Sequence, residues 1–446
     1  MAKRYFIETF GCQMNDLDSE KIAGSLSHSG MEPAADVSEA DVIILNTCSV
    51  RQKAVQKVYT RLGEIKQYKA IRKDILVGVV GCMTQLEKDR ILKRAPYVNI
   101  LAGPQKGHVM GHLVQLGANS HEPIVDLRTD EAPSPLQTPS ILRGSSWRAN
   151  VTISEGCNRQ CAFCVVPLAR GKERVRDSAD ILREIGDLAA KGYIEIVLLG
   201  QTVNSYWDRS SNNVSFAELL RRAAKIEGIK RIRFTSPHPS DFSDELLDVM
   251  VSCPSVCNHI HLPVQSGSTR VLKAMRRGYT RESYLKIIRK IQSAPRAIAI
   301  STDLIAGFPG ESEADFQDTL SLLDEVQYDS VFSFKYSARP RTAALDFPDE
   351  ISEEEKGRRL DMLQQKQTLI QYSRNSAYLG RQLEVLVEGN ARSRFRLMGR
   401  LSNNKIVNFD WPDAQIGRFV QVEITGFSPN SLKGVGFNLR TGGEKS

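Results

Sequence analysis

The chain has 446 residues, of which 41% are hydrophobic and 25% are charged. This composition is that of a globular protein with room for two to four domains. The formal net charge of +8 favours a polyanionic partner such as nucleic acid. The sequence has neither an apolar run that could span a bilayer nor the apolar region of a signal peptide. We therefore expect a cytoplasmic protein without a membrane partner, whose eight cysteines serve metal binding or catalysis rather than disulfides.

Residues 1–128 alternate between apolar, β-rich runs and amphipathic runs. Such alternation predicts an open parallel α/β domain. The expected strands are 4–10, 41–47, 75–80 and 98–102, and the expected helices are 18–29 and 50–67.

Each of the first three expected strands ends at a cysteine, namely Cys12, Cys48 and Cys82. Because the carboxyl ends of parallel strands share one edge of the sheet, these thiols should converge. Small residues such as Gly11 and Gly81 precede them, which would let a bulky group approach the backbone. We infer an iron–sulfur cluster on these three thiolates; the alternative is three buried cysteines that pack as small hydrophobic residues.

Residues 129–146 are rich in Pro and Ser and are expected to form a linker. Strand and helix signals then alternate again over 147–378. Six strand–helix units predict a partial (β/α)6 barrel, whose active site lies at the carboxyl ends of the strands. The expected strands are 149–154, 195–199, 231–235, 258–262, 297–305 and 330–336, with helices at 177–191, 215–226, 241–251, 281–293 and 313–325.

A C-x3-C-x2-C motif of Cys157, Cys161 and Cys164 follows the first barrel strand. Three thiolates this close together favour an iron–sulfur cluster in which one of four irons stays open to a small molecule. Zinc is the alternative, but a zinc site needs a fourth ligand, and the next downstream histidine is His238.

A helix is expected at 352–378, and residues 379–446 then change character. Four short strand signals predict a small β-barrel of OB-like type, at 382–387, 395–401, 405–409 and 419–426. This tail carries ten Lys or Arg and six Asp or Glu residues. We interpret its basic residues as RNA contacts, with a solvated face as the alternative. The candidates are Arg392, Arg394, Arg396, Arg400 and Lys405.

The three-cysteine motif of the barrel resembles that of the radical S-adenosylmethionine (SAM) enzymes. In that family the open iron binds SAM, and the cofactor carries out the chemistry while the protein positions it. The resemblance implies SAM contacts from Phe163, Gly200, Gln201 and Gly307.

All three expected domains together resemble the methylthiotransferase family of radical SAM enzymes, whose tail is a TRAM domain that binds RNA. Residues 9–15, Thr-Phe-Gly-Cys-Gln-Met-Asn, resemble the subgroup that acts on isopentenylated adenosine, and residues 46–51 and 261–268 agree. The resemblance implies two [4Fe-4S] clusters and SAM as cofactors. It also implies that a methylthio group is added to C2 of N6-(dimethylallyl)adenosine at position 37 of tRNA, next to the anticodon.

The implied partners are the anticodon stem-loop of such a tRNA and a reducing electron donor. The family offers two alternative substrates, threonylcarbamoyl-adenosine in tRNA and a ribosomal protein side chain. Two alternatives lie outside catalysis by this family, an electron-transfer protein with two clusters and a zinc-dependent RNA-binding protein. No catalytic residue is assigned beyond the six cluster cysteines.

Overall fold

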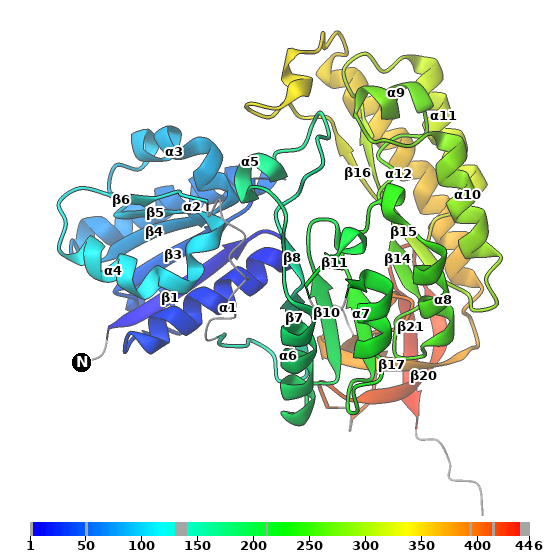
Figure 1. Ribbon diagram of the computed structural model, residues 1–446, viewed down its shortest axis with the longest axis horizontal. Helices are drawn as coiled ribbons and strands as arrows, with labels where there is room; N and C mark the ends of the chain where they lie inside the picture. Colours follow the sequence, from blue (N-terminus) through cyan, green and yellow to red (C-terminus); the bar gives the residue numbers. More distant parts are fainter. Residues whose placement is uncertain are drawn as a thin grey trace, which may run out of the picture.

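Three bodies make up the molecule in the computed structural model (Figure 1), which describes residues 3–49, 52–129, 141–210, 213–391, 395–412 and 415–437, without the side chains of 52 and 53. An N-terminal α/β domain lies beside a central barrel, and a small β-barrel packs beneath the central one. Within the described residues, no helix combines the length and the apolar character that a membrane crossing needs. The three-part architecture expected from the sequence is confirmed, whereas its precise domain boundaries stay predictions.

The N-terminal domain is a six-stranded parallel sheet in the order β2-β1-β3-β4-β5-β6. Helices α1 and α4 pack on one face of the sheet, and α2 and α3 pack on the other. The central strands β3 and β4 are buried throughout, as expected for parallel strands covered on both faces. The strands are β1 (Arg4–Phe10), β2 (Glu32–Pro33), β3 (Val42–Thr47), β4 (Leu76–Gly81), β5 (Ile100–Ala102) and β6 (Ile124–Asp126). The helices are α1 (Gln13–His28), α2 (Gln52–Ile71), α3 (Cys82–Arg94) and α4 (Met110–Ala118).

Four elements of this domain were not expected from the sequence, namely β2, β6, α3 and α4. The edge strands β2 and β6 are only two and three residues long, too short for a periodic signal. Helix α3 was missed entirely, and α1 begins five residues earlier than expected, directly after Cys12. Both helices therefore start at the cysteines.

The central barrel has six parallel strands in two sheets of three, β13-β10-β7 and β14-β15-β16. An isolated bridge joins Ile232 of β13 to Val256, which lies just before β14. The strands are β7 (Arg148–Thr152), β10 (Glu195–Leu199), β13 (Arg231–Phe234), β14 (His259–His261), β15 (Ala299–Ala306) and β16 (Ser330–Lys335). The covering helices are α6 (Ser178–Ala190), α7 (Phe216–Ala223), α8 (Asp244–Ser252), α10 (Arg281–Gln292), α11 (Glu313–Val326) and α12 (Glu353–Ser376). Shorter elements near the carboxyl ends of the strands are β8 (Ser154–Glu155), α5 (Val166–Arg170) and α9 (Thr269–Ala274).

The C-terminal body is a closed five-stranded barrel in the order β17-β18-β19-β21-β20. Its interior is apolar, with Val385, Val407 and Phe409 fully buried. The last strand, β21, was not expected; it follows the turn 428–431 and closes the barrel against β19 and β20. The strands are β17 (Gln382–Asn390), β18 (Leu397–Arg400), β19 (Ile406–Asp410), β20 (Phe419–Phe427) and β21 (Leu432–Phe437).

The small barrel docks at the end of the central barrel where the parallel strands begin. From β13, Arg231 donates to the carbonyl oxygen of Arg400 at 2.7 Å, and Arg233 donates to that of Leu401 at 2.9 Å. This end lies opposite the carboxyl ends of the strands, where the cysteine motif is found (Figure 1).

Candidate functional site

Three thiols meet at the carboxyl edge of the N-terminal sheet. Strands β1, β3 and β4 are parallel neighbours, in which Phe10 pairs with Thr47 and Thr47 pairs with Gly81. A cysteine follows each of these strand ends, and Cys48 and Cys12 both act electrostatically on Cys82, so the three thiols lie near one another. We call this set the N-terminal thiol triad: Cys12, Cys48 and Cys82.

A network of buried amides holds the three strand ends in place. The Asn15 side chain accepts a hydrogen bond from the Cys12 backbone N–H at 3.2 Å and donates to Asn46 Oδ1 at 3.1 Å and to the Thr47 carbonyl oxygen at 3.3 Å. The Asn46 side chain donates in turn to the Asn15 carbonyl oxygen at 2.8 Å and to Ser19 Oγ at 2.9 Å. Helix α1 is thereby tied to β3, and both carry a cysteine of the triad.

The glycines before Cys12 and Cys82 serve a purpose different from the expected one. A Cβ atom at Gly11 would lie 2.1 Å from Asn15 Oδ1. A Cβ atom at Gly81, where φ is +107°, would lie 2.4 Å from the Thr47 carbonyl oxygen. The space they leave is therefore filled by the domain's own polar network rather than kept for a bound group.

Buried thiols in the N-terminal triad need positive charge to ionise. Burial raises the pKa of the Cys82 thiol to about 11, Arg170 offsets part of this, and Cys48 and Cys12 raise it further. Only thiolates bind metals, so three mutually close thiols of this kind suit a cationic metal cluster that keeps them ionised.

The barrel thiol triad, Cys157, Cys161 and Cys164, lies on the loop between β8 and α5. Two of its sulfurs accept backbone N–H groups, from Arg159 to Cys157 Sγ at 3.4 Å and from Val166 to Cys164 Sγ at 3.5 Å. Burial raises the pKa of Cys164 to about 12. N–H donors aimed at sulfur, with burial, are the surroundings expected of cluster-bound thiolates.

Arg277 donates to the third sulfur of the barrel triad. Its Nη1 lies 3.3 Å from Cys161 Sγ, and its other donors reach the Pro263 carbonyl oxygen at 3.0 Å and the Tyr279 hydroxyl at 2.9 Å. The residue is only 7% exposed. A permanent positive charge is thus fixed beside a sulfur of the barrel thiol triad. Sequence reasoning missed this residue, because a single arginine between two helices carries no pattern.

Two of the expected SAM contacts shape the cysteine loop itself. The Gln201 side chain accepts a hydrogen bond from the Gly156 backbone N–H, which precedes Cys157. A Cβ atom at Gly200 would lie 2.6 Å from Ser154 Oγ, so only glycine fits there without displacement. These contacts place both residues at the barrel mouth, and their contact with SAM stays a prediction.

The other two expected SAM contacts are Phe163, within the cysteine loop, and Gly307, directly after β15. The ring of Phe163 meets the edge of Phe308 at a centroid distance of 6.5 Å, within a small apolar cluster. Gly307, at φ +72°, makes room for the stem of Lys356 in α12, and its N–H donates to Glu311 Oε2 at 2.8 Å. Here too the SAM contact stays a prediction.

Three buried polar atoms at the barrel mouth have no hydrogen-bond partner among the described residues. They are Thr152 Oγ1, Ser154 Oγ and His238 Nε2. Burial, together with Arg277 and Arg159, lowers the pKa of His238 to about 2, so its ring is neutral. Since buried polar atoms are normally paired, a polar ligand such as SAM fits this mouth.

Buried ion pairs join the two domains close to both thiol triads. Arg170 in α5 pairs with Asp18 in α1 at 2.6 Å, and Lys21 pairs with Glu155, two residues before Cys157, at 3.1 Å. Burial opposes the charge of Glu155, but nearby cations outweigh it and hold its pKa below the ordinary value.

Arg170 also acts electrostatically on Cys82, and α3 contacts α5 (Figure 1). Both triads therefore border one interface between the N-terminal domain and the barrel. No group of His, Cys, Asp or Glu within the described ranges is arranged for a single metal ion. The thiols of a cluster each bind a different iron, so they need not converge on one point.

Two of the expected RNA contacts are engaged within the protein. Lys405 has a side chain only 9% exposed, which pairs with Asp329 of the central barrel at 3.0 Å. Arg400 pairs with Glu388 at 3.2 Å on the neighbouring strand. We therefore assign Lys405 to domain docking and leave it out of the RNA contacts proposed below.

Of the other three expected RNA contacts, the structure describes Arg396, which precedes β18. Arg396 is exposed, and its backbone N–H donates to Asp410 at 2.9 Å. Its side chain is thus available to a polyanion. Two candidates, Arg392 and Arg394, lie outside the described residues.

Three family models match successive parts of the chain. Residues 4–103 match the uncharacterized protein family UPF0004, residues 151–323 match the radical SAM superfamily, and residues 376–435 match the TRAM domain. These matches follow the three bodies of the structure.

Curated relatives match almost the whole chain and share one name, tRNA-2-methylthio-N(6)-dimethylallyladenosine synthase. The protein of Solibacter usitatus is 47% identical, over 97% of this chain and 98% of its own. Those of Koribacter versatilis and Yersinia enterocolitica are 45% and 43% identical, over 97% and 98% of this chain and 98% and 92% of their own.

Solved structures share the fold at low sequence identity. The radical SAM methyltransferase TsrM of Kitasatospora setae superposes with a TM-score of 0.55 at 15% identity, covering 79% of this chain and 76% of its own. The cobalamin-dependent SAM radical enzyme OxsB gives a TM-score of 0.51 at 14% identity, covering 83% and 56%. These likenesses concern the fold alone.

Proposed function

The chain belongs to the tRNA-2-methylthio-N(6)-dimethylallyladenosine synthase family of radical SAM enzymes, and we propose that it adds a methylthio group to C2 of N6-(dimethylallyl)adenosine at position 37 of tRNA. Its cofactors are [4Fe-4S] clusters and SAM. The observation that carries the proposal is the placement of two thiol triads at one domain interface. Threonylcarbamoyl-adenosine and a ribosomal protein are not favoured as substrates, because the relatives share the dimethylallyladenosine name.

We assign one cluster to each triad. Cys12, Cys48 and Cys82 would hold the auxiliary cluster, and the barrel motif would hold the cluster that binds SAM. When bound, these groups supply the reducing electron, the radical that takes hydrogen from C2, and the methylthio group. The C2–H bond of the adenine ring is not acidic, so the acids and bases of the side chains cannot readily remove its hydrogen as a proton.

The residues of the chain position and shield these groups. Arg277 fixes a positive charge beside Cys161, and the Asn15–Asn46 network fixes the strand ends that carry the N-terminal triad. The unpaired Thr152, Ser154 and His238 atoms offer hydrogen bonds to polar groups of SAM. The proposed SAM site also includes four residues because they lie at the barrel mouth: Phe163, Gly200, Gln201 and Gly307.

The substrate we propose is the anticodon stem-loop, because the target adenosine lies in a single-stranded loop whose bases can be splayed into a pocket. Arg396, with Arg392 and Arg394, would contact its phosphates, and Arg400, whose side chain is still 25% exposed beside Glu388, would join them. A reducing electron donor is also required. We place the protein in the cytoplasm, where thiols stay reduced.

The test is an anaerobic assay of the reduced, cluster-loaded protein with SAM and an anticodon stem-loop that carries N6-(dimethylallyl)adenosine. Mass spectrometry of the nucleosides should show the 2-methylthio product. Parallel reactions with threonylcarbamoyl-adenosine RNA, unmodified RNA and ribosomal proteins serve as controls. If only one of these controls is methylthiolated, the substrate assignment is wrong.

A further inference from the structure

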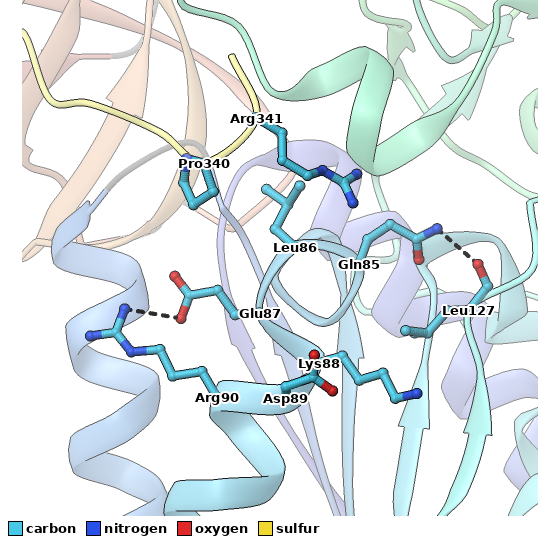
Figure 2. A pocket seen from close by; sticks show the side chains of 9 residues that line it. All are labelled: Gln85, Leu86, Glu87, Lys88, Asp89, Arg90, Leu127, Pro340 and Arg341. Carbon is cyan, nitrogen blue, oxygen red and sulfur yellow. Dashed lines mark hydrogen bonds and ion pairs between the residues drawn. The ribbon is translucent and has the colours of Figure 1, made fainter. Parts of the chain in front are cut away.

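A cavity of about 450 Å³ lies where helix α3 faces the segment that follows β16, at the interface between the N-terminal domain and the barrel (Figure 2). Helix α3 begins at Cys82, and the cavity is lined by its first turns. On the other side, Arg339 interacts electrostatically with Cys48 and with Glu87 of the cavity. The cavity therefore adjoins the N-terminal thiol triad.

Arg341 extends into this cavity in a way that no contact with the protein explains. Its guanidinium points toward Leu86 and Gln85 (Figure 2). Within the described ranges it makes no hydrogen bond or ion pair. Its backbone adopts φ +61°, a left-handed conformation that is uncommon for a side chain of this size. Unfavourable backbone conformations persist mainly where a site requires them.

The cavity also offers an unpaired acceptor and an apolar wall. Gln85 Nε2 donates to the Leu127 carbonyl oxygen at 2.8 Å, which fixes the amide and leaves Oε1 buried with no partner among the described residues. Leu86 and Pro340 are the apolar side chains next to Arg341 in the lining, with Leu86 drawn between Pro340 and Gln85 (Figure 2). A flat apolar ring could pack there.

Acidic residues do not cancel this arrangement. Glu87 is engaged by the Tyr59 hydroxyl at 2.6 Å and lies 3.6 Å from Arg90, so its charge is compensated within the protein. Asp89 and Lys88, both exposed, also line the cavity, so one negative and one positive charge are added there together. Among the described residues, Arg341 and Lys88 are thus the lining cations without an ion pair, and Arg341 is the one that comes from the barrel side.

We propose that this cavity binds a nucleotide of the RNA that flanks the target adenosine, an inference that rests on the proposed function. Arg341 binds its phosphate, Gln85 Oε1 accepts an N–H of its base, and Leu86 and Pro340 pack on the base. An unpaired cation, an unpaired acceptor and an apolar wall match the three parts of a nucleotide. A flanking nucleotide bound in this cavity, near Cys82, would hold the RNA close to the N-terminal thiol triad.

The test compares Arg341→Gly and Arg341→Lys in the cluster-loaded protein, by fluorescence anisotropy of a labelled anticodon stem-loop with N6-(dimethylallyl)adenosine. Glycine suits the left-handed backbone, so it removes the guanidinium without disturbing the turn, whereas lysine keeps a charge. We expect Arg341→Gly to raise Kd about tenfold and to lower the salt dependence by about one phosphate contact. Arg341→Lys should retain most of the affinity.

Arg289→Gln is the matched control, because it removes one exposed arginine from α10, on the side of the barrel away from the N-terminal domain (Figure 1). It should leave Kd unchanged. Gln85→Met, which removes the acceptor, should raise Kd less than Arg341→Gly does.

Two results would overturn the inference. The first is an Arg341→Gly protein that binds the stem-loop as the native protein does. The second is a protein in which Arg341→Gly weakens the binding of free adenosine monophosphate but not the binding of the stem-loop. That result would make the cavity a site for free nucleotides. If the native protein neither binds nor methylthiolates the stem-loop, the proposed function fails instead.

Discussion

The two thiol triads are built by different means. The barrel triad occupies eight consecutive residues on one loop, and its sulfurs receive donors from the backbone and from Arg277. The N-terminal triad spans three strand ends, and its geometry depends on the sheet register and on the Asn15–Asn46 network. The first is thus encoded locally, whereas the second exists only once the domain has folded. The two triads should therefore respond differently to substitution.

The largest effect should come from the cysteines themselves. Cys48→Ala and Cys161→Ala should both abolish methylthiolation, since each removes a ligand of one cluster. Reductive cleavage of SAM, followed as 5'-deoxyadenosine by chromatography, should survive in Cys48→Ala and vanish in Cys161→Ala. Cys253→Ala is the control, because Cys253 follows α8 and belongs to neither triad. Equal loss of SAM cleavage in both cluster variants would mean that the triads do not have separate roles.

The contrast between the triads also explains what the sequence could and could not predict. The C-x3-C-x2-C spacing is visible in the sequence, and three strands that each end at a cysteine allowed the second triad to be inferred. Arg277 and Asn15 could not be found this way, because their roles depend on contacts across 116 and 31 residues. Helix α3 was missed because it begins at Cys82 directly after the apolar strand β4, and no capping side chain marks its start.

The β-barrel tail shows the same limit. Its type was predicted from strand and turn signals, but not where it docks. The series of basic residues predicts Lys405 as an RNA contact. In the structure Lys405 forms an ion pair with Asp329, which lies before β16 in another domain. No local pattern reports such a pairing.

The second largest effect should come from the ion pair that joins the domains. Arg170→Met leaves Asp18 buried without its partner, which should destabilise the protein by about 3–5 kcal/mol. Chemical denaturation followed by circular dichroism measures this loss. The double variant Arg170→Met with Asp18→Asn should recover part of it. A single variant as stable as the native protein would show that this contact does not hold the triads together.

A smaller effect is expected from the amide network. Asn15→Leu removes hydrogen bonds to Cys12, Asn46 and Thr47 and should cost about 1–3 kcal/mol. Iron bound by the N-terminal triad should fall, while SAM cleavage by the barrel triad remains. Ser29→Ala, at the far end of α1, is the control. Unchanged iron content in Asn15→Leu would contradict the view that this triad depends on the fold.

The smallest effect should be on the reduction potential of the cluster proposed for the barrel triad. Arg277→Met removes a positive charge and a hydrogen bond from Cys161, so the cluster should become harder to reduce, with a more negative potential. A redox titration followed by electron paramagnetic resonance reports this shift. Arg276→Gln, an exposed neighbour, should leave the potential unchanged. A potential that does not move in Arg277→Met would exclude this role for the arginine.

The most direct test of two separate clusters is the iron content of anaerobically reconstituted protein, combined with Mössbauer spectra of the native chain and the two cysteine variants. We expect about eight irons in the native protein and about four remaining in each of Cys48→Ala and Cys161→Ala, all in cubane clusters. Zinc in place of iron, or complete loss of iron from either single variant, would contradict this expectation.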